Sequence, residues 1–209
     1  MTKPTKPHDE FDRWAASYDR DAGLNTGFPF EGYSDVLSTI VNKSCAKPGD
    51  AVLDLGTGTG NLANLFAQRG CQIWGVDFSP AMLALAQKKL PAARLAQMDL
   101  RDDLQVAFPR RYDLIVSAYT FHHFPLDEKV ALVSRYLENH LQPGGKFLIG
   151  DIAFMTGAEQ AATRAVFCET WEQEFYWLAD ESIAAFKTAG IHLAYTQVSI
   201  CAGVFLVLN

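Results

Sequence analysis

The sequence predicts an α/β protein built on a mostly parallel sheet with helices on both faces. From Asp50 onward, short apolar runs rich in β-forming residues alternate with stretches of helical periodicity, which is the pattern of strands joined by crossover helices. Most of these runs are too apolar for one face of the sheet to contact water, so helices should cover both faces. No internal repeat or linker interrupts the pattern, and we expect a single domain over residues 1–209.

Strands and helices alternate through the middle of the chain. The expected strands are Ala51–Leu55, Gln72–Val76, Arg94–Met98, Tyr112–Ser117 and Lys146–Gly150, and the expected helices are Asn61–Gln68, Pro80–Lys89 and Asp127–Leu141. Ser79 is a typical N-cap and Pro80 a typical first helical residue, so together they predict where the second helix begins. Gly70 and the Pro-Gly-Gly turn at residues 143–145 predict the ends of the first and third helices.

The last two strands must pair in the opposite sense. Ile191–Val198 and Val204–Leu208 are β-rich runs joined by a connection too short for a crossover helix. They therefore form an antiparallel hairpin. We expect seven strands in all, with the last one antiparallel, in a core that spans residues 50–209.

Two segments outside the sheet are candidates to cover a pocket. Residues 1–45 are expected to form an N-terminal helical cap, in which two helices flank a turn at Gly27–Gly32. A further helix is expected at about residues 157–178, inserted after the fifth strand. Its aromatic residues lie at helical i, i+4 spacing: Phe167, Trp171 and Phe175. Such a stripe either lines a pocket or buries its rings against the sheet as ordinary core.

The composition excludes several classes of protein. The chain is 49% hydrophobic and 20% charged, which is typical of a globular domain, and its net charge of -6 repels a nucleic-acid backbone. The first residues carry no apolar signal segment, and no apolar run approaches the roughly 20 residues of a membrane span. Four scattered cysteines form neither a metal motif nor a disulfide framework. We expect a cytoplasmic protein that binds no nucleic acid, membrane or metal ion.

Three glycines at alternate positions follow the first expected strand. Gly56, Gly58 and Gly60 come directly after Asp54 and Leu55, at the point where a helix is expected to begin. Glycine permits positive φ and lets a ligand approach the backbone closely. The dinucleotide fingerprint GxGxxG is not met, and no GK[ST] follows, so a cradle for a pyrophosphate group is disfavoured.

Acidic residues end the first three expected strands. Asp77 closes the second strand beside the glycine loop, where one carboxylate can accept hydrogen bonds from both hydroxyls of a ribose. At the end of the third strand, Met98 can pack against a flat ring and Asp99 can accept from an exocyclic amine. Asp54 adds negative charge that attracts an ammonium or a sulfonium group. These residues predict a ligand that is a cationic amino-acid nucleoside.

Four sequence motifs, taken in order, are similar to those of a known family. VLDLGTGTG, VDFSPAML, QMDL and LQPGGKFLI occur in this order. The chain resembles the class I S-adenosylmethionine-dependent methyltransferases over essentially residues 11–209. The resemblance implies a Rossmann-like sheet of order 3-2-1-4-5-7-6, S-adenosylmethionine as cofactor and S-adenosylhomocysteine as product. The segments FDRWAASYD and SAYTFHH are similar to the small bacterial YrrT-like group.

The same resemblance assigns cofactor contacts residue by residue. It implies that the three loop glycines admit the methionine part, that Asp77 grips the ribose, and that Met98 and Asp99 bracket the adenine. The other cofactor-binding candidates are Trp14, Tyr18, Asp54, Phe78, Met82 and Ser117. For Trp14 and Tyr18, which resemble an aromatic N-terminal cap over the cofactor, the alternative is a helix face packed on the core.

The catalytic candidates follow the fourth expected strand. His122 and His123 lie where reacting groups gather in this architecture, and either can act as a base or orient the acceptor. The alternative is a structural role, in which the histidines bond loop carbonyls. Tyr119 borders the same edge. A thiol acceptor needs no dedicated base if its pKa is lowered, whereas an alcohol or a carbon acid needs a proton acceptor.

Three functions stay open at this point. The leading interpretation is an enzyme that transfers a methyl group to a small-molecule acceptor by in-line displacement. The second is a methyltransferase acting on protein or RNA, although Ser117–Thr120 stands where an Asn-Pro-Pro-Tyr type signature would be. The third is a non-catalytic protein that only binds S-adenosylmethionine. The acceptor, its methylated atom and the oligomeric state are not determined by the sequence.

Overall fold

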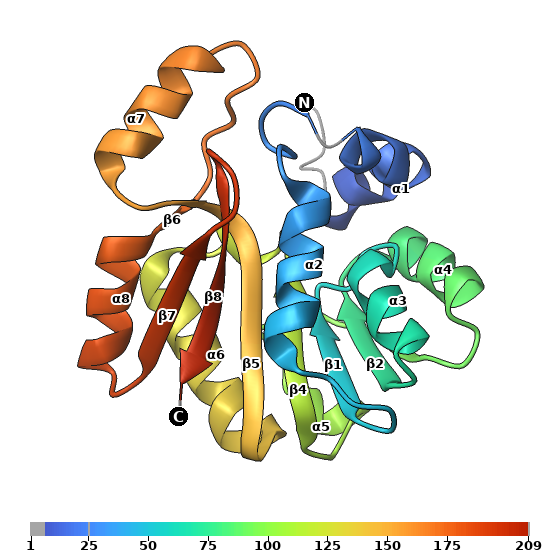
Figure 1. Ribbon diagram of the computed structural model, residues 1–209. Coiled ribbons are helices and arrows are strands. Elements are labelled where there is room, and N and C mark those ends of the chain that lie inside the picture. Colours follow the sequence, from blue (N-terminus) through green and yellow to red (C-terminus); the bar gives the residue numbers. More distant parts are fainter. Residues whose placement is uncertain (1–6, 25, 209) are drawn as a thin grey trace, which may run out of the picture.

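The computed structural model describes residues 7–24 and 26–208. Residues 1–6 and Asn25 of the expected cap, and Asn209 at the end of the expected domain, lie outside the described residues. A twisted sheet runs through the centre, and helices lie on both of its faces (Figure 1). This arrangement confirms the α/β class with a doubly covered sheet.

The sheet has the expected strand order. The strands are β1 (Ala51–Leu55), β2 (Gln72–Asp77), β3 (Arg94–Gln97), β4 (Tyr112–Ala118), β5 (Leu141–Phe154), β6 (Trp177–Leu178), β7 (His192–Gln197) and β8 (Ala202–Leu208). The main path runs β3-β2-β1-β4-β5-β8-β7, which is the implied order once the short β6 is set aside. β8 is antiparallel to both of its neighbours, as expected for the C-terminal hairpin. β6 was not expected, and it pairs in parallel with the end of β5.

Side chains on the central strands alternate between two cores. Val52, Leu114 and Leu148 belong to the apolar cluster on one face, whereas their neighbours Leu53 and Ile115 belong to the cluster on the other. All five lie almost entirely out of solvent. Because successive strand residues point to opposite faces, a strand covered on both sides needs an unbroken apolar run. This is why the runs in the sequence predicted these strands.

Helices fill both layers. They are α1 (Pro7–Gly23), α2 (Tyr33–Ser44), α3 (Asn61–Gln68), α4 (Pro80–Lys89), α5 (Leu104–Ala107), α6 (Leu126–His140), α7 (Gly157–Val166) and α8 (Ala179–Thr188), with a short 3-10 helix, η1, at Phe121–His123. Ser79 caps α4 as predicted, because its hydroxyl accepts from the backbone N–H of Met82. α2 packs on β5 and β8, whereas α6 and α8 pack together on the opposite face.

The inserted helix is shorter than expected. Helix α7 ends at Val166 instead of near residue 178, and residues 171–176 have no regular structure before β6. The aromatic spacing reflects tertiary packing: the ring of Trp171 stacks on Phe28, which belongs to the turn between α1 and α2, at 4.7 Å. Phe175 is exposed and belongs to no aromatic stripe. The prediction of one helix over residues 157–178 was therefore wrong beyond Val166.

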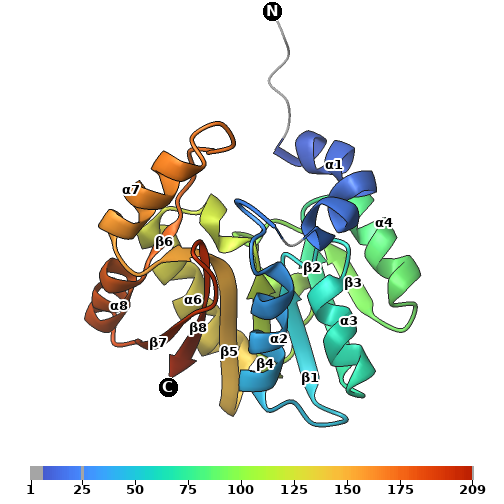
Figure 2. The same cartoon turned by 45° about the horizontal axis from the view of Figure 1, so that its top comes forward.

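Two helical elements lie beyond the same edge of the sheet. The carboxyl ends of the parallel strands run toward α1 and α7, which stand on either side of this edge (Figure 2). The two expected N-terminal helices are present as α1 and α2. Among the described helices, none combines the length and the apolar character that crossing a bilayer requires. The edge below α1 and α7 is where the cavities of the protein open.

Candidate active site

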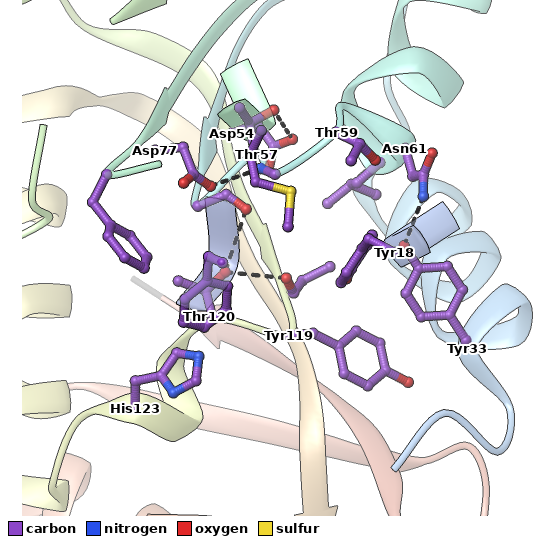
Figure 3. Close-up of a pocket in the computed structure, with 17 residues that line it drawn as sticks. Tyr18, Tyr33, Asp54, Thr57, Thr59, Asn61, Asp77, Tyr119, Thr120 and His123 are labelled. Carbon is purple, nitrogen blue, oxygen red and sulfur yellow. Dashed lines mark hydrogen bonds between the residues drawn. The ribbon is translucent and has the colours of Figure 1, made fainter. Parts of the chain in front are cut away.

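Two adjoining cavities lie at the carboxyl ends of the parallel strands. The larger has a volume of about 630 Å³ and the smaller about 60 Å³, and both are bordered by Gly56, Asp77, Tyr119 and His123. Ligand sites of small-molecule enzymes typically have about 300–1,000 Å³. The smaller cavity lies against the glycine loop (Figure 3), and the larger extends toward residues 170–176.

The glycine loop joins β1 to α3 with left-handed backbone. Gly56, Gly58 and Gly60 have φ of 70°, 53° and 83°. A Cβ on Gly56 would lie 2.2 Å from the hydroxyl oxygen of Thr120, whereas a Cβ on Gly58 would meet nothing within 4 Å. Gly60 lies outside both cavities, and its missing side chain lets α3 approach Ala86 of α4. Gly60 therefore serves helix packing, and the ligand contact that the resemblance implied for it stays a prediction.

Gly56→Ala should destabilise the protein more than Gly58→Ala. Both substitutions place a side chain at positive φ, which costs roughly 1–2 kcal/mol. Only alanine at position 56 also clashes with Thr120, and overpacking of this kind adds about 1–3 kcal/mol. Urea unfolding of the two variants measures the difference directly. Equal losses of unfolding free energy would contradict the packing role of Gly56.

Asp54 lines the smaller cavity and keeps one carboxylate oxygen without a partner in the described part of the chain. Its carboxylate is 1% exposed, and one oxygen, Oδ2, accepts a hydrogen bond from the Thr57 hydroxyl at 2.8 Å. The other oxygen, Oδ1, has no hydrogen-bond partner among the described residues. Burial raises the pKa of Asp54 to about 7. A buried carboxylate without a full set of donors calls for a cationic or hydrogen-bonding ligand.

Asp77 is fixed by backbone donors on both oxygens. Oδ2 accepts from the N–H of Gly58 at 2.8 Å, and Oδ1 accepts from the N–H of Ser79 at 2.9 Å. Burial raises the pKa of Asp77, against the lowering effect of these hydrogen bonds. Each carboxylate oxygen keeps a lone pair for a further donor. The side chain therefore has acceptor sites for the paired hydroxyls of a ribose, and its contact with a ribose stays a prediction.

The expected adenine residues border the larger cavity. Met98 and Asp99 both line it, together with Phe78, whose ring lies edge-on to Phe11 at 5.0 Å. Asp99 also forms an ion pair with Arg101 at 3.2 Å. Met82 lines the smaller cavity instead. The ion pair with Arg101 was not predicted from the sequence. It balances the charge of Asp99, whose carboxylate can still accept a hydrogen bond from an amine.

Aromatic residues of α1 stand over the cavities. Trp14 and Tyr18 pack edge-to-face at 4.9 Å, and both contact the ring of Phe30. Trp14 lines the larger cavity and Tyr18 lines both. Burial is the main cause that raises the pKa of Tyr18, followed by neighbouring Tyr33. One face of α1 is therefore packed and cavity-lining at once, and the role of these residues as a cap over the cofactor stays a prediction.

Two acids of α1 fasten this helix to the core. Asp12 accepts from the hydroxyl of Ser79 at 2.5 Å. Asp19 accepts from Thr59 at 2.5 Å and from Asn61 at 3.0 Å, and it pairs with Lys89 at 3.0 Å. These hydrogen bonds lower the pKa of Asp19 although burial opposes them. Asp19 thus joins α1 to the glycine loop and to α4.

Asp19→Ala should weaken the binding of a ligand at the glycine loop about tenfold. The substitution removes two hydrogen bonds and a partly exposed ion pair, which together contribute on the order of 1–2 kcal/mol to holding α1 closed. Titration calorimetry measures the affinity, and limited proteolysis of α1 reports its opening. Asp35→Ala, at an exposed position in the first turn of α2, is the matched control. If both variants bind equally well, α1 is not coupled to the site.

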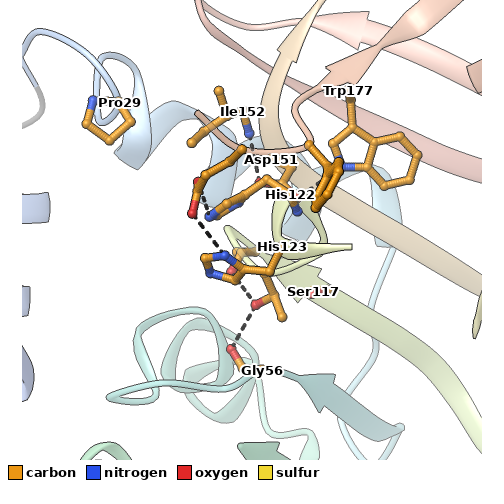
Figure 4. A network of polar contacts seen from close by, with 12 residues as sticks. Pro29, Gly56, Ser117, His122, His123, Asp151, Ile152 and Trp177 are labelled. Atoms are coloured by element: carbon orange, nitrogen blue, oxygen red, sulfur yellow. Dashed lines mark hydrogen bonds and ion pairs between the residues drawn. The ribbon is translucent and has the colours of Figure 1, made fainter. Parts of the chain in front are cut away.

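The two histidines of η1 belong to a buried polar network (Figure 4). His122 Nδ1 lies 2.6 Å from Asp151 Oδ1, and the His122 backbone N–H donates to Asp151 Oδ2 at 2.9 Å. Trp177 Nε1 and the backbone N–H of Ile152 also donate to Asp151. Burial alone would raise the pKa of Asp151, but His122 and the other donors outweigh it and lower the pKa. Asp151 therefore fixes the ring orientation of His122.

Glu174 reaches this network from the irregular segment before β6. One of its oxygens lies 3.1 Å from His123 Nδ1, and the other lies 3.4 Å from His122 Nε2. Two backbone hydrogen bonds of the neighbouring Phe175 hold the segment in place. The Phe175 N–H donates to the His122 carbonyl at 3.0 Å, and the Phe175 carbonyl accepts from Lys129 Nζ at 2.5 Å. Burial lowers the pKa of Lys129 to about 8.

Tyr119 and Ser117 take different positions at the end of β4. Tyr119 has a φ of 52°, an uncommon left-handed conformation for a residue other than glycine, and its ring lines both cavities. Its buried hydroxyl has no partner among the described residues. Ser117 borders neither cavity, because its hydroxyl donates to the Leu55 carbonyl at 2.7 Å and ties β4 to β1. The structure thus places Ser117 beneath the site instead of in it.

Several residues of the site were not predicted from the sequence. Cavity-lining residues or partners of the histidines that were not proposed include Phe11, Phe30, Tyr33, Thr57, Asn61, Thr120, Glu172 and Glu174. Asp151 directly follows the expected fifth strand, which predicts that it borders the same edge of the sheet as Tyr119. Glu174 had no such signal, because its distance from His123 along the chain says nothing about their contact.

Comparison with known proteins decides the family. A family model described as a methyltransferase domain matches residues 52–145. An uncharacterized methyltransferase of Geobacillus kaustophilus is 34% identical over 201 residues, which cover 90% of each chain. This chain belongs to the methyltransferase family. The narrower likeness to the YrrT-like group stays a prediction.

Solved methyltransferase structures share the whole fold. The DhpI-SAM-HEP complex is 18% identical with a TM-score of 0.70, over 99% of this methyltransferase and 100% of that chain. The magnesium protoporphyrin IX methyltransferase ChlM from Synechocystis PCC 6803, solved with bound SAH, is 18% identical with a TM-score of 0.69 over 97% of both chains. These likenesses confirm the class I methyltransferase fold, including the implied strand order.

Proposed function

We propose that this methyltransferase transfers the methyl group of S-adenosylmethionine to a small-molecule acceptor bound in the larger cavity. S-adenosylmethionine is the methyl donor of the family, and solved neighbours of the same fold hold SAM or SAH. Whether this chain fits the donor depends on the residues around the glycine loop. The observation that carries the proposal is the pair of buried carboxylates, Asp54 and Asp77, at one wall of the cavities.

The two carboxylates match the two polar ends of the donor. The unpartnered Oδ1 of Asp54 suits the ammonium group of the methionine part, and Asp77 suits the ribose hydroxyls. Met98 and Asp99 lie beside the adenine position, and Trp14 and Tyr18 cover the donor from α1. When bound, the donor supplies an electrophilic methyl carbon on sulfur. The chain's own residues fix its orientation and exclude water.

The acceptor side follows from the positions of His122, His123 and Tyr119. All three border the larger cavity. We infer that the histidines bind and orient the acceptor, and that Tyr119 contributes its unpartnered hydroxyl. In-line displacement requires the acceptor atom within about 3 Å of the methyl carbon, so positioning carries much of the acceleration. A cavity of about 630 Å³ has room for a small acceptor beside the donor.

Transfer of labelled methyl into cell extract tests the proposal. We expect the label of S-adenosylmethionine to enter the small-molecule fraction with wild-type protein and not with Asp77→Ala. Label in the protein or RNA fraction would replace the small acceptor by a macromolecule. Tight binding of S-adenosylmethionine without transfer to any fraction would identify a non-catalytic binding protein and overturn the proposal.

A further inference from the structure

Three potential metal ligands meet at the wall of the larger cavity. His122, His123 and Glu174 each offer one ligand atom, and these atoms all lie within 4.8 Å of one another. Glu174 lies 3.4 Å from His122 Nε2 and 3.1 Å from His123 Nδ1. Bonds of about 2.0–2.1 Å to a tetrahedral zinc ion separate neighbouring ligand atoms by roughly 3.3 Å. The two separations between Glu174 and the histidines are close to this value.

Asp151 gives His122 the surroundings of a metal-bound histidine. A histidine that binds a metal through one nitrogen almost always donates its other N–H to a carboxylate or carbonyl. Here Nδ1 of His122 faces Asp151 Oδ1 at 2.6 Å, and Asp151 is wholly buried and accepts from Trp177 and Ile152 as well. The other nitrogen, Nε2, lies 3.4 Å from the Glu174 carboxylate, so a cation held between them has a ligand atom on each side.

The third ligand is held in place by its neighbour in the chain. Phe175 donates to the His122 carbonyl and accepts from the buried ammonium of Lys129. Glu174 therefore keeps its place although residues 171–176 have no regular structure. Such support for a ligand is the condition for binding a metal without reorganising the protein.

We propose that His122, His123 and Glu174 bind one Zn²⁺ ion whose open coordination position faces the acceptor cavity. Two histidines and one glutamate form a known catalytic zinc set, in which the fourth position holds water or substrate. All three residues border the larger cavity, so that position is accessible to a small molecule. The ion coordinates an ionisable hydroxyl or thiol of the acceptor and lowers its pKa. This acceptor role, though not the ion site itself, rests on the proposed function.

No sequence pattern indicates this site, and the expectation of no metal ion followed from the lack of a CxxC motif or a Cys/His cluster. His122 and His123 are adjacent, but Glu174 comes from the far side of β5 and α7. No short motif joins them. Only the path of the irregular segment 171–176 back to η1 brings the carboxylate to the imidazoles.

Zinc titration of the purified, reduced protein tests the site without any acceptor. We expect wild-type protein to bind one Zn²⁺ per chain in the micromolar range or tighter, measured by calorimetry and by metal content after dialysis. Loss of an outer partner of a metal ligand typically costs about 10- to 100-fold in affinity. Glu174→Gln and His123→Ala remove ligands themselves and should weaken binding at least that much.

Matched variants exclude adventitious zinc. Glu169→Gln and His192→Asn change exposed residues of the same types outside the cluster, and they should bind as the wild type does. Circular dichroism confirms that each variant is folded. Wild-type protein that retains no more zinc than folded Glu174→Gln would overturn the proposal, as would equal losses in the two control variants.

The methyl-transfer assay separates this inference from the proposed function. Transfer to a small acceptor that stops with a chelator and returns with added Zn²⁺ supports the acceptor role of the ion. Transfer unaffected by the chelator overturns that role while the proposed function stands. Zinc bound at the cluster in a protein that transfers no methyl group would instead support the site and overturn the proposed function.

Discussion

Asp77→Ala should lower the affinity for S-adenosylmethionine by about a hundredfold or more. Hydrogen bonds to a charged partner contribute about 1.5–3 kcal/mol each, and the ribose offers two hydroxyls to this carboxylate. The substitution also frees the N–H groups of Gly58 and Ser79, which Asp77 now holds. Titration calorimetry with S-adenosylmethionine and with S-adenosylhomocysteine measures the loss for both forms of the ligand.

Asp77→Asn is the control for this result. It keeps the shape and one carbonyl oxygen, so binding should fall less than in the alanine variant. A folded Asp77→Ala protein that binds both ligands as tightly as the wild type would remove the ribose role of Asp77. It would also withdraw half of the support for the donor position.

Asp54 should make donor binding depend on pH. Burial raises its pKa to about 7 in the free protein, so the carboxylate is largely protonated below that pH. Only the ionised form pairs with the donor ammonium. Binding therefore releases a proton, and affinity should rise by up to about tenfold per pH unit from pH 5.5 toward 7, then level off. In Asp54→Asn, affinity should be low and nearly independent of pH over this range.

The stability of the free protein should change in the opposite direction. An acid whose pKa is higher in the folded state than in the unfolded state binds more protons when folded. Between the usual aspartate pKa and about 7, unfolding free energy should therefore fall as pH rises, and Asp54→Asn should remove this contribution. Thermal unfolding of both proteins across pH 4–8 measures it. Identical pH profiles would show that Asp54 is not the titrating group.

Local patterns in the sequence predicted which residues gather around the glycine loop. The apolar runs of β1 and β2, the glycines after β1 and the acid that ends β2 are all short-range features, and the crossover rule places their carboxyl ends together. Among these residues, Gly60 and Ser117 turned out to serve packing and strand pairing. A strand-end residue reaches the edge of the sheet by periodicity, but whether its side chain faces the ligand depends on its neighbours.

The acceptor half depends on long-range contacts. The aromatic repeat Phe167, Trp171 and Phe175 has helical spacing, yet stacking of Trp171 on Phe28 overrides it. The same irregular path sets the place of Glu174 beside the histidines. No periodicity in the sequence encodes a contact between the turn before α2 and the segment before β6. The position of the acceptor half at the sheet edge could therefore be predicted, but the contacts between its residues could not.

The structure therefore separates two tasks along the chain. The residues proposed to bind the donor come mostly from α1 through the end of β3, whereas those proposed to bind the acceptor come from the end of β4 through β6. Substitutions in the stretch between α7 and β6 should change which compound is methylated without weakening binding of the donor. Exchange of that stretch between relatives is accordingly the natural way to alter specificity in this scaffold.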